Sequence, residues 1–283
     1  MLKIENGKYE VKINPMGAEL SGLYGKAEKT EYMWQGIPEI WSGRSPILFP
    51  VVGRLKDDKY IYEGKEYKMP KHGFVRKELF KIKEQSEDSL TLTYKDYKKY
   101  YEAYPFEYEF SVKFEVTDKG VKVTHIVENL GDKDMYFSLG AHPGIECGKG
   151  AYLEFPETES VRAYRFHEDR IIKEETDEFL PGTNIFKIYD ETFVDDAYVL
   201  EGLKSAYVIV KAPELNRSVK VDFGGAPYLG VWAKPAAPYV CIEPWFGLDD
   251  DVFATGKIEE KKGIVKLPAK ETFKFAVTIE PQY

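Results

Sequence analysis

The chain has 283 residues, of which 43% are hydrophobic and 15% aromatic, so it is long enough to bury a large core. Its formal net charge is −8, and the charges are mixed along the chain without a basic block. Nucleic-acid binding needs clustered Lys and Arg, so we expect no nucleic-acid partner. The absence of a signal-peptide pattern and of any long apolar run indicates a cytoplasmic protein without a membrane partner. Cys147 and Cys241 are expected to be reduced thiols.

Strand patterns dominate the chain. Residues 90–97 carry the first clear pattern, and residues 95–103 predict a helix of two turns that the following proline ends. Residues 106–116 alternate apolar and polar side chains, which is typical of a strand with one buried face. The segment 121–130 repeats this pattern, and 207–223 is expected to form two strands joined by a turn.

Turn signals separate these short strands, and helical patterns are few. Single helical turns are expected only around 39–42 and 248–252. Many short strands at regular spacing indicate a sandwich or barrel and not alternating strand–helix units. No linker, repeat or low-complexity tract divides the sequence. We therefore expect one all-β domain over residues 1–283.

The four histidines fall into two kinds. His125 has the parity of the valines in its strand, which favours a core position, and His167 lies in a charged stretch, which favours an exposed loop. His72 and His142 lie beside Gly or Pro in turns that follow strands, where a fixed backbone aims the imidazole reproducibly. Turn histidines are also common surface residues, so a functional and a structural role both remain open for them.

Glu243 ends an apolar strand in which it shares one face with Tyr239, Cys241 and Trp245. Burial of this carboxyl would raise its pKa, and carboxyl groups in apolar settings are often acid/base catalysts. The alternative is an exposed Glu at a strand end.

Arg54 and the pair Asp195–Asp196 also lie at strand ends. The Arg54 guanidinium can donate hydrogen bonds to sugar hydroxyls or to a carboxylate of a ligand. The alternative is that Arg54 forms a surface ion pair. The two aspartates are ligand groups or turn formers. Metal, nucleotide and serine-hydrolase motifs are missing from the sequence.

Five motifs together resemble the aldose 1-epimerase family, the galactose mutarotase-like proteins, and the bacterial LacX-like branch most of all. They are FPVVGR (49–54), KHGF (71–74), SLGAHPG (138–144), DDAYVL (195–200) and CIEPW (241–245). The resemblance covers most of the chain. It implies a galactose mutarotase-like β-supersandwich, largely antiparallel, with an open active-site cleft on one side.

The resemblance also implies roles for individual residues. Glu243 would be the general base and His142 the general acid, while His72 would position the sugar and stabilise charge at its ring oxygen. Arg54 and Asp195 match the substrate-binding Arg and Asp of the family, with the neighbouring Asp196 left open as the alternative. The implied activity is an isomerase that interconverts the α and β anomers of a hexose.

The chemistry of these residue types agrees with that activity. Opening a cyclic hemiacetal requires a base at the C1 hydroxyl and an acid at the ring oxygen. A carboxylate and an imidazolium suit such reversible exchange, particularly when the site pushes them to opposite protonation states. No redox change occurs, so we expect no cofactor and no metal.

Two departures leave the sugar open. Galactose mutarotases usually carry Asn where this chain has Gly53, and Asp-His where it has Asp195-Asp196. The string HGFVR, with Arg76, also resembles the hexose-6-phosphate 1-epimerase branch, in which an Arg could bind phosphate.

Two other classes of function are compatible with these residues. The first is a non-catalytic sugar-binding protein that uses tryptophans such as Trp232 to stack on sugar faces. The second is a hydrolase, with Glu243 and Asp195 as a glycosidase pair or two histidines and a carboxylate on a metal. Neither hydrolase type has a local signature. The chain is expected to be a monomer or a homodimer.

Overall fold

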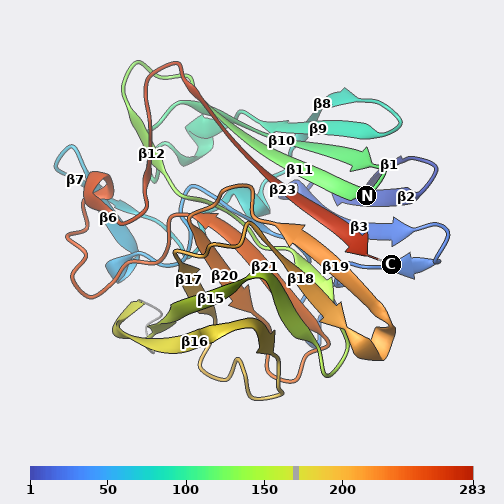
Figure 1. Ribbon diagram of the computed structural model, residues 1–283. Helices are drawn as coiled ribbons and strands as arrows, with labels where there is room; N and C mark the ends of the chain where they lie inside the picture. Colours follow the sequence, from blue (N-terminus) through green and yellow to red (C-terminus); the bar gives the residue numbers. More distant parts are fainter. Residues whose placement is uncertain (168–171, 283) are drawn as a thin grey trace.

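One long antiparallel sheet organises the molecule. The computed structural model describes residues 1–167 and 172–282 (Figure 1), and every described pair of its named strands is antiparallel. The main sheet contains fifteen described strands, of which β14 and β16 pair at its side. Their bounds, in sheet order, are β5 (Ile47–Leu48), β13 (Leu139–Ala141), β21 (Tyr239–Phe246), β20 (Tyr228–Trp232), β17 (Tyr198–Glu201), β15 (Tyr152–Phe166), β18 (Tyr207–Ala212), β19 (Arg217–Asp222), β23 (Thr272–Gln282), β11 (Gly120–Asn129), β10 (Tyr108–Thr117), β9 (Ser89–Tyr94) and β8 (Lys81–Gln85), with β14 (Gly144–Glu146) and β16 (Ile172–Lys187).

Three smaller sheets and five short 3-10 helices complete the described structure. The small sheets are β1 (Leu2–Glu5) to β2 (Tyr9–Asn14), β3 (Glu19–Gly25) and β4 (Thr30–Glu31); β6 (Lys59–Tyr62) with β7 (Lys65–Lys68); and β12 (Met135–Phe137) with β22 (Val265–Leu267). The helices are η1 (Lys56–Asp58), η2 (Val75–Lys77), η3 (Tyr97–Tyr100), η4 (Pro213–Leu215) and η5 (Ile258–Glu260). None of the described helices has the length and apolar character to cross a membrane.

The all-β prediction is confirmed, and so are the principal strands. The alternating segments form β9, β10 and β11, and the predicted pair at 207–223 is β18 and β19 joined by η4. Figure 1 shows β23 running between the group β8–β11 and the group β15–β21. Because β23 pairs with β19 on one side and with β11 on the other, both groups belong to one curled sheet. Sheets of this many strands curl because each strand twists against its neighbour.

The helix predictions are largely wrong. The segment 95–103 contains only the single turn η3, because a helix of two turns is too short to be stable on its own and η3 has no side-chain cap. Residues 39–42 and 248–252 form turns and irregular loops. In the second of these, Asp249 and Asp250 accept hydrogen bonds from main-chain N–H groups of a distant loop, which holds their backbone in a non-helical form.

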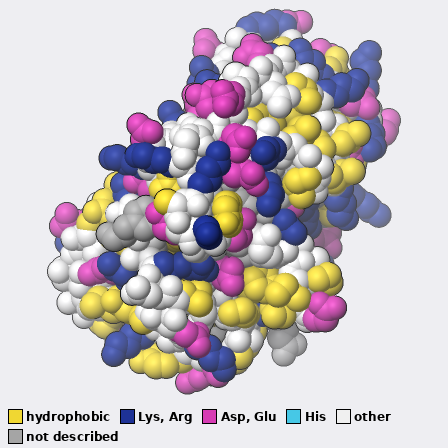
Figure 2. Space-filling view, turned by 90° about the vertical axis from the view of Figure 1, so that its right-hand side faces the viewer, with side chains coloured by type: hydrophobic (Ala, Val, Ile, Leu, Met, Phe, Trp, Pro, Cys, Tyr) yellow, Lys and Arg dark blue, Asp and Glu magenta, His cyan; other side chains and the backbone are white. Residues whose placement is uncertain are grey.

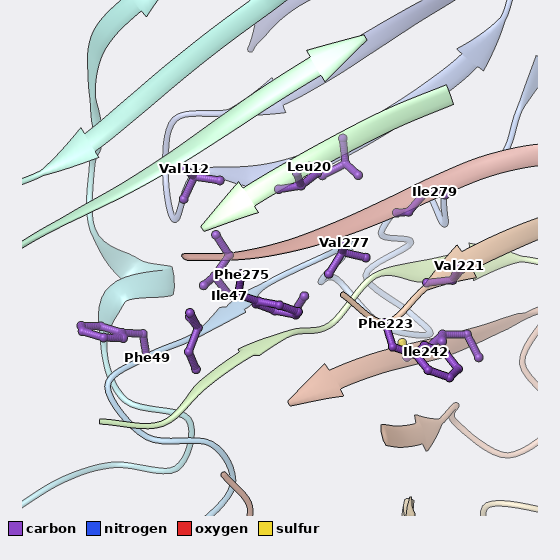
Figure 3. Packing of buried hydrophobic residues seen from close by; sticks show 14 of the residues in the cluster. Leu20, Ile47, Phe49, Val112, Val221, Phe223, Ile242, Phe275, Val277 and Ile279 are labelled. Atoms are coloured by element: carbon purple, nitrogen blue, oxygen red, sulfur yellow. The ribbon is translucent and has the colours of Figure 1, made fainter. Parts of the chain in front are cut away.

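The inward face of the curled sheet is a continuous apolar core. Figure 3 shows Val112 of β10, Val277 of β23 and Ile242 of β21 among its members. β21 is buried along nearly its whole length, and successive side chains of a strand point to opposite faces. Ile242 therefore packs in the core, while the next residue, Glu243, faces the other side of the sheet.

The outer surface carries both signs of charge. Figure 2 shows Lys and Arg side chains interspersed with Asp and Glu on the face in view. The mixing on this face matches the sequence, in which charges of both signs are mixed without a basic block.

Two of the histidines lie where the sequence places them. His125 is a core residue, 1% exposed, and its ring stacks on Phe275 at a centroid distance of 5.3 Å. His167 is exposed. Burial lowers the pKa of His125 to about 4.

This buried imidazole should make stability depend on pH. Between its usual pKa of 6.5 and about 4, the unfolded chain binds a proton at His125 that the folded chain does not, so stability falls as pH falls through that window. The loss from this one group is about 3 kcal/mol. Urea unfolding measured at neutral pH and near pH 4 gives the free energy of unfolding that is lost between the two. In the His125→Leu variant this loss should be smaller than in the wild type by that amount. Equal losses in the variant and the wild type would contradict the assignment.

Candidate active site

The register of the sheet brings His142 and Glu243 together. β13 and β14 both pair with β21, and Gly140 of β13 lies opposite Trp245. Because β14 keeps the same register, His142, in the gap between β13 and β14, comes opposite Glu243. The Nε2 atom of His142 lies 3.2 Å from Oε1 of Glu243. The two side chains thus meet because of strand pairing and not through a flexible loop.

Burial determines where the proton of this pair lies. The Glu243 side chain is 2% exposed and that of His142 is 12% exposed. Desolvation raises the pKa of Glu243 well above its usual range and lowers the pKa of His142 to about 3. Both shifts favour a neutral pair with its proton on Glu243. The predicted burial of Glu243 is confirmed, and the alternative of an exposed strand end is wrong.

A left-handed turn fixes the second candidate histidine. His72 has a φ of +64°, and its N–H donates to the carbonyl of Gly53 at 2.8 Å. The N–H of Gly53 in turn donates to Nδ1 of His72 at 3.0 Å. An acceptor Nδ1 requires that the neutral ring carry its proton on Nε2. Burial, with a contribution from Lys71, lowers the pKa of His72 well below its usual value, so the ring is a neutral N–H donor.

The two histidines are neighbours. Their ring centroids lie 6.4 Å apart, and the ring planes are nearly perpendicular. His72, His142 and Glu243, which the sequence analysis selected from three distant segments, therefore form one cluster.

Aromatic rings surround His142. Trp41 stacks on it at 5.2 Å, and Trp232 meets it edge-on at 5.7 Å. Both tryptophans are partly exposed, which leaves ring surface for a ligand. Trp34 and Trp245 are buried, at 2% and 3% exposure, so their rings are closed to a ligand.

Two cations lie near the pair. Arg76 belongs to η2 and donates to the carbonyl of Lys71 at 3.3 Å. The charges of Arg76 and Lys71 both depress the pKa of His142, and Lys71 also opposes the raised pKa of Glu243. Arg76 thus lies close enough for its charge to act on His142, and its substrate-binding role stays a prediction. Lys71 was missed by the sequence analysis, although it opens the KHGF motif.

The other two predicted binding residues have protein partners. The Arg54 guanidinium forms two hydrogen bonds to Asp58, both at 2.8 Å, which is the ion-pair alternative foreseen for it. Asp195 is 83% exposed and lies 3.8 Å from Arg165. Asp196 has a φ of +78° and accepts from the N–H of the next residue, as a turn former does. The described contacts do not join Asp195 to the His142–Glu243 pair.

Three side chains of the cluster have metal-ligand spacing. Ligand atoms of His142, Cys241 and Glu243 lie within 4.8 Å of one another. A nitrogen, sulfur and oxygen donor set of this kind suits zinc. Cys241 is fully buried, and burial raises the pKa of its thiol well above the usual value, which works against the thiolate that a metal needs. The donor set therefore fits a metal only in part.

A buried carboxyl, Asp249, was also missed. It is 4% exposed, and its Oδ1 accepts from the Arg54 N–H at 2.7 Å. The only sequence signal was an unusual run of three aspartates after the CIEPW strand. Nothing in that run indicates which distant loop it contacts.

Comparison with known proteins identifies the chain's relatives. The family model for aldose 1-epimerase matches residues 1–257. The plasmid-encoded protein LacX of Lactococcus lactis subsp. lactis is 30% identical over 289 residues, which cover 96% of both chains.

Solved structures show the same fold. A galactose mutarotase related enzyme from Lactobacillus acidophilus is 31% identical with a TM-score of 0.93, over 100% of this chain and 97% of that one. A galactose mutarotase-like protein from Lactobacillus casei ATCC 334 is 28% identical with a TM-score of 0.93, over 100% of both chains. The galactose mutarotase-like fold expected from the motifs is confirmed.

Proposed function

We propose that this chain, which belongs to the aldose 1-epimerase family, interconverts the α and β anomers of a hexose with Glu243 as base and His142 as acid. Membership of the family, together with the mutarotase-related structures, makes the chain an isomerase that acts on a sugar, in preference to a binding protein. The choice of sugar and the roles of the residues are our proposal.

The observation that carries the mechanism is the 3.2 Å contact between His142 and Glu243. When a sugar binds, the single proton of the pair moves to His142. Glu243 takes the proton of the C1 hydroxyl, His142 gives its proton to the ring oxygen, and the bond between C1 and the ring oxygen breaks. Rotation about C1–C2 and the reverse transfers close the ring on the other face. No proton is gained or lost over the cycle.

Burial favours the central step of this cycle. After ring opening the proton lies on Glu243 and His142 is neutral, which is the distribution that desolvation prefers. The site therefore stabilises the state that holds the open-chain aldehyde. General acid and general base assistance each contribute about 10²–10⁴-fold in rate.

His72 and the tryptophans complete the proposed site. The Nε2–H of His72 donates to a sugar oxygen beside His142 and stabilises charge that develops at the ring oxygen. Trp41 and Trp232 offer apolar ring faces for the C–H side of the sugar.

Anomer exchange by NMR tests the proposal directly. Glucose, galactose and glucose 6-phosphate are followed separately, with and without protein, and we expect accelerated exchange of at least one free hexose. Exchange accelerated only for the phosphate would instead favour a hexose-6-phosphate 1-epimerase. The observation behind that second candidate is the pair of cations, Lys71 and Arg76, near His142. Acceleration of none of the three would contradict the proposal for these sugars.

The pH dependence tests the one-proton pair. The pair gains a second proton only near the lowered pKa of His142, about 3, and loses its proton only above the raised pKa of Glu243. We therefore expect kcat/KM, corrected for spontaneous exchange, to stay level as pH falls through 6.5, the usual pKa of imidazole, as long as the chain stays folded. Activity should fall on the alkaline side. An acid limb near 6.5 would show that an ordinary imidazole governs the rate.

A further inference from the structure

Asp249 reaches from the loop after β21 to the turn that holds His72. Its Oδ1 accepts from the Arg54 N–H at 2.7 Å, and the next residue extends the contact, because the Asp250 N–H donates to the Arg54 carbonyl at 2.9 Å. The Asp250 carboxylate accepts from the Lys56 N–H at 2.9 Å and pairs with the buried Lys261 at 2.6 Å. The two aspartates thus bind the backbone of residues 54–56.

Gly53 lies directly against the Asp249 carboxyl group. A Cβ added at Gly53 would lie 2.1 Å from Cγ and Oδ2 of Asp249 and 2.3 Å from Oδ1. No Cβ fits at such distances, and the φ of +68° at Gly53 also disfavours a side chain. The space that a side chain at position 53 would occupy is therefore filled by the carboxyl group of Asp249.

Gly53 also holds His72. The Gly53 N–H donates to Nδ1 of His72, and the Gly53 carbonyl accepts from its N–H. A continuous chain of contacts runs from the Asp249 carboxyl through the peptide between Gly53 and Arg54 to the main-chain N–H of His72. The N–H of the same Gly53 then holds the His72 ring at Nδ1. Asp249 is 4% exposed, and its Oδ1 is engaged by the Arg54 N–H, which places this carboxyl group in the support of the turn.

We infer that Asp249 is a positioning residue that fixes the orientation and tautomer of His72 through the Gly53–Arg54 turn. The consequence for catalysis rests on the proposed function, whereas the consequence for the His72 ring does not. Displacement of a catalytic group by about 1 Å can cost on the order of 10²-fold in rate. The effect should appear in kcat more than in KM if His72 stabilises charge that develops during ring opening.

The test compares Asp249→Ala with Asp249→Asn. The Asn side-chain carbonyl can accept the Arg54 N–H bond, so Asp249→Asn should keep kcat within about threefold of wild type, whereas Asp249→Ala should lose about 10²-fold. With ¹⁵N-labelled histidine, NMR should show His72 in wild type and Asp249→Asn as the tautomer protonated at Nε2. In Asp249→Ala the ring should show mixed tautomers.

Two further variants serve as controls. Glu159→Ala also removes a buried carboxyl that binds main-chain N–H groups, those of Lys204 and Ser205, and should leave the His72 signals unchanged.

If Asp249→Ala does not fold, Gly53→Ala disturbs the same contact with Asp249 in place and should also mix the tautomers. A single wild-type tautomer in folded Asp249→Ala or Gly53→Ala overturns the inference. Equal losses of kcat in Asp249→Asn and Asp249→Ala would also overturn it. If the His72 tautomers change among the variants as expected but the wild-type protein has no epimerase activity, only the proposed function is contradicted.

Discussion

The site depends on one constraint, the shared register of β13 and β14 on β21. That register places His142 opposite Glu243 at 3.2 Å. A one-residue slip of the pairing would turn these side chains to the other face of the sheet. The apolar core on that other face, to which Ile242 contributes, fixes the register. The energy of core packing thereby holds His142 and Glu243, the proposed acid and base, at a constant separation.

The burial that fixes the pair also tunes it. In water near neutral pH a carboxyl group is ionised and an imidazole is partly protonated, whereas in this site desolvation makes the neutral pair, with its proton on Glu243, the preferred form. One proton shared by two adjacent groups suits the ring opening that we propose, because that reaction moves protons but does not consume them. The neutral His72 ring, held by Gly53, adds an Nε2–H hydrogen-bond donor. This ring does not compete for the proton that Glu243 and His142 share.

Local patterns in the sequence predicted much of this arrangement. Alternation over residues 106–116 predicted β10, and the parity of residues 239–245 predicted that Glu243 lies on the face opposite to Ile242. Glycine and proline near His72 and His142 indicated fixed turns. These signals work because strand geometry has a strict period of two and because few residues tolerate the required backbone conformations.

Pairings between distant segments could not be predicted. The bond from Arg54 to Asp58 and the approach of Asp195 to Arg165 are examples, because neither partner is indicated by the motifs that contain Arg54 and Asp195. Asp249 contacts a turn almost two hundred residues earlier in the chain. Such contacts depend on how the curled sheet brings loops together, which no local period encodes.

The most direct test of this account is the rate of anomer exchange in the Glu243→Gln variant. Gln keeps the shape of the side chain but cannot accept the C1 proton, so exchange should fall by at least about 10²-fold while the chain remains folded. Glu159→Gln, at another buried glutamate, should retain the wild-type rate. A wild-type rate in folded Glu243→Gln would contradict the assignment of Glu243 as the base.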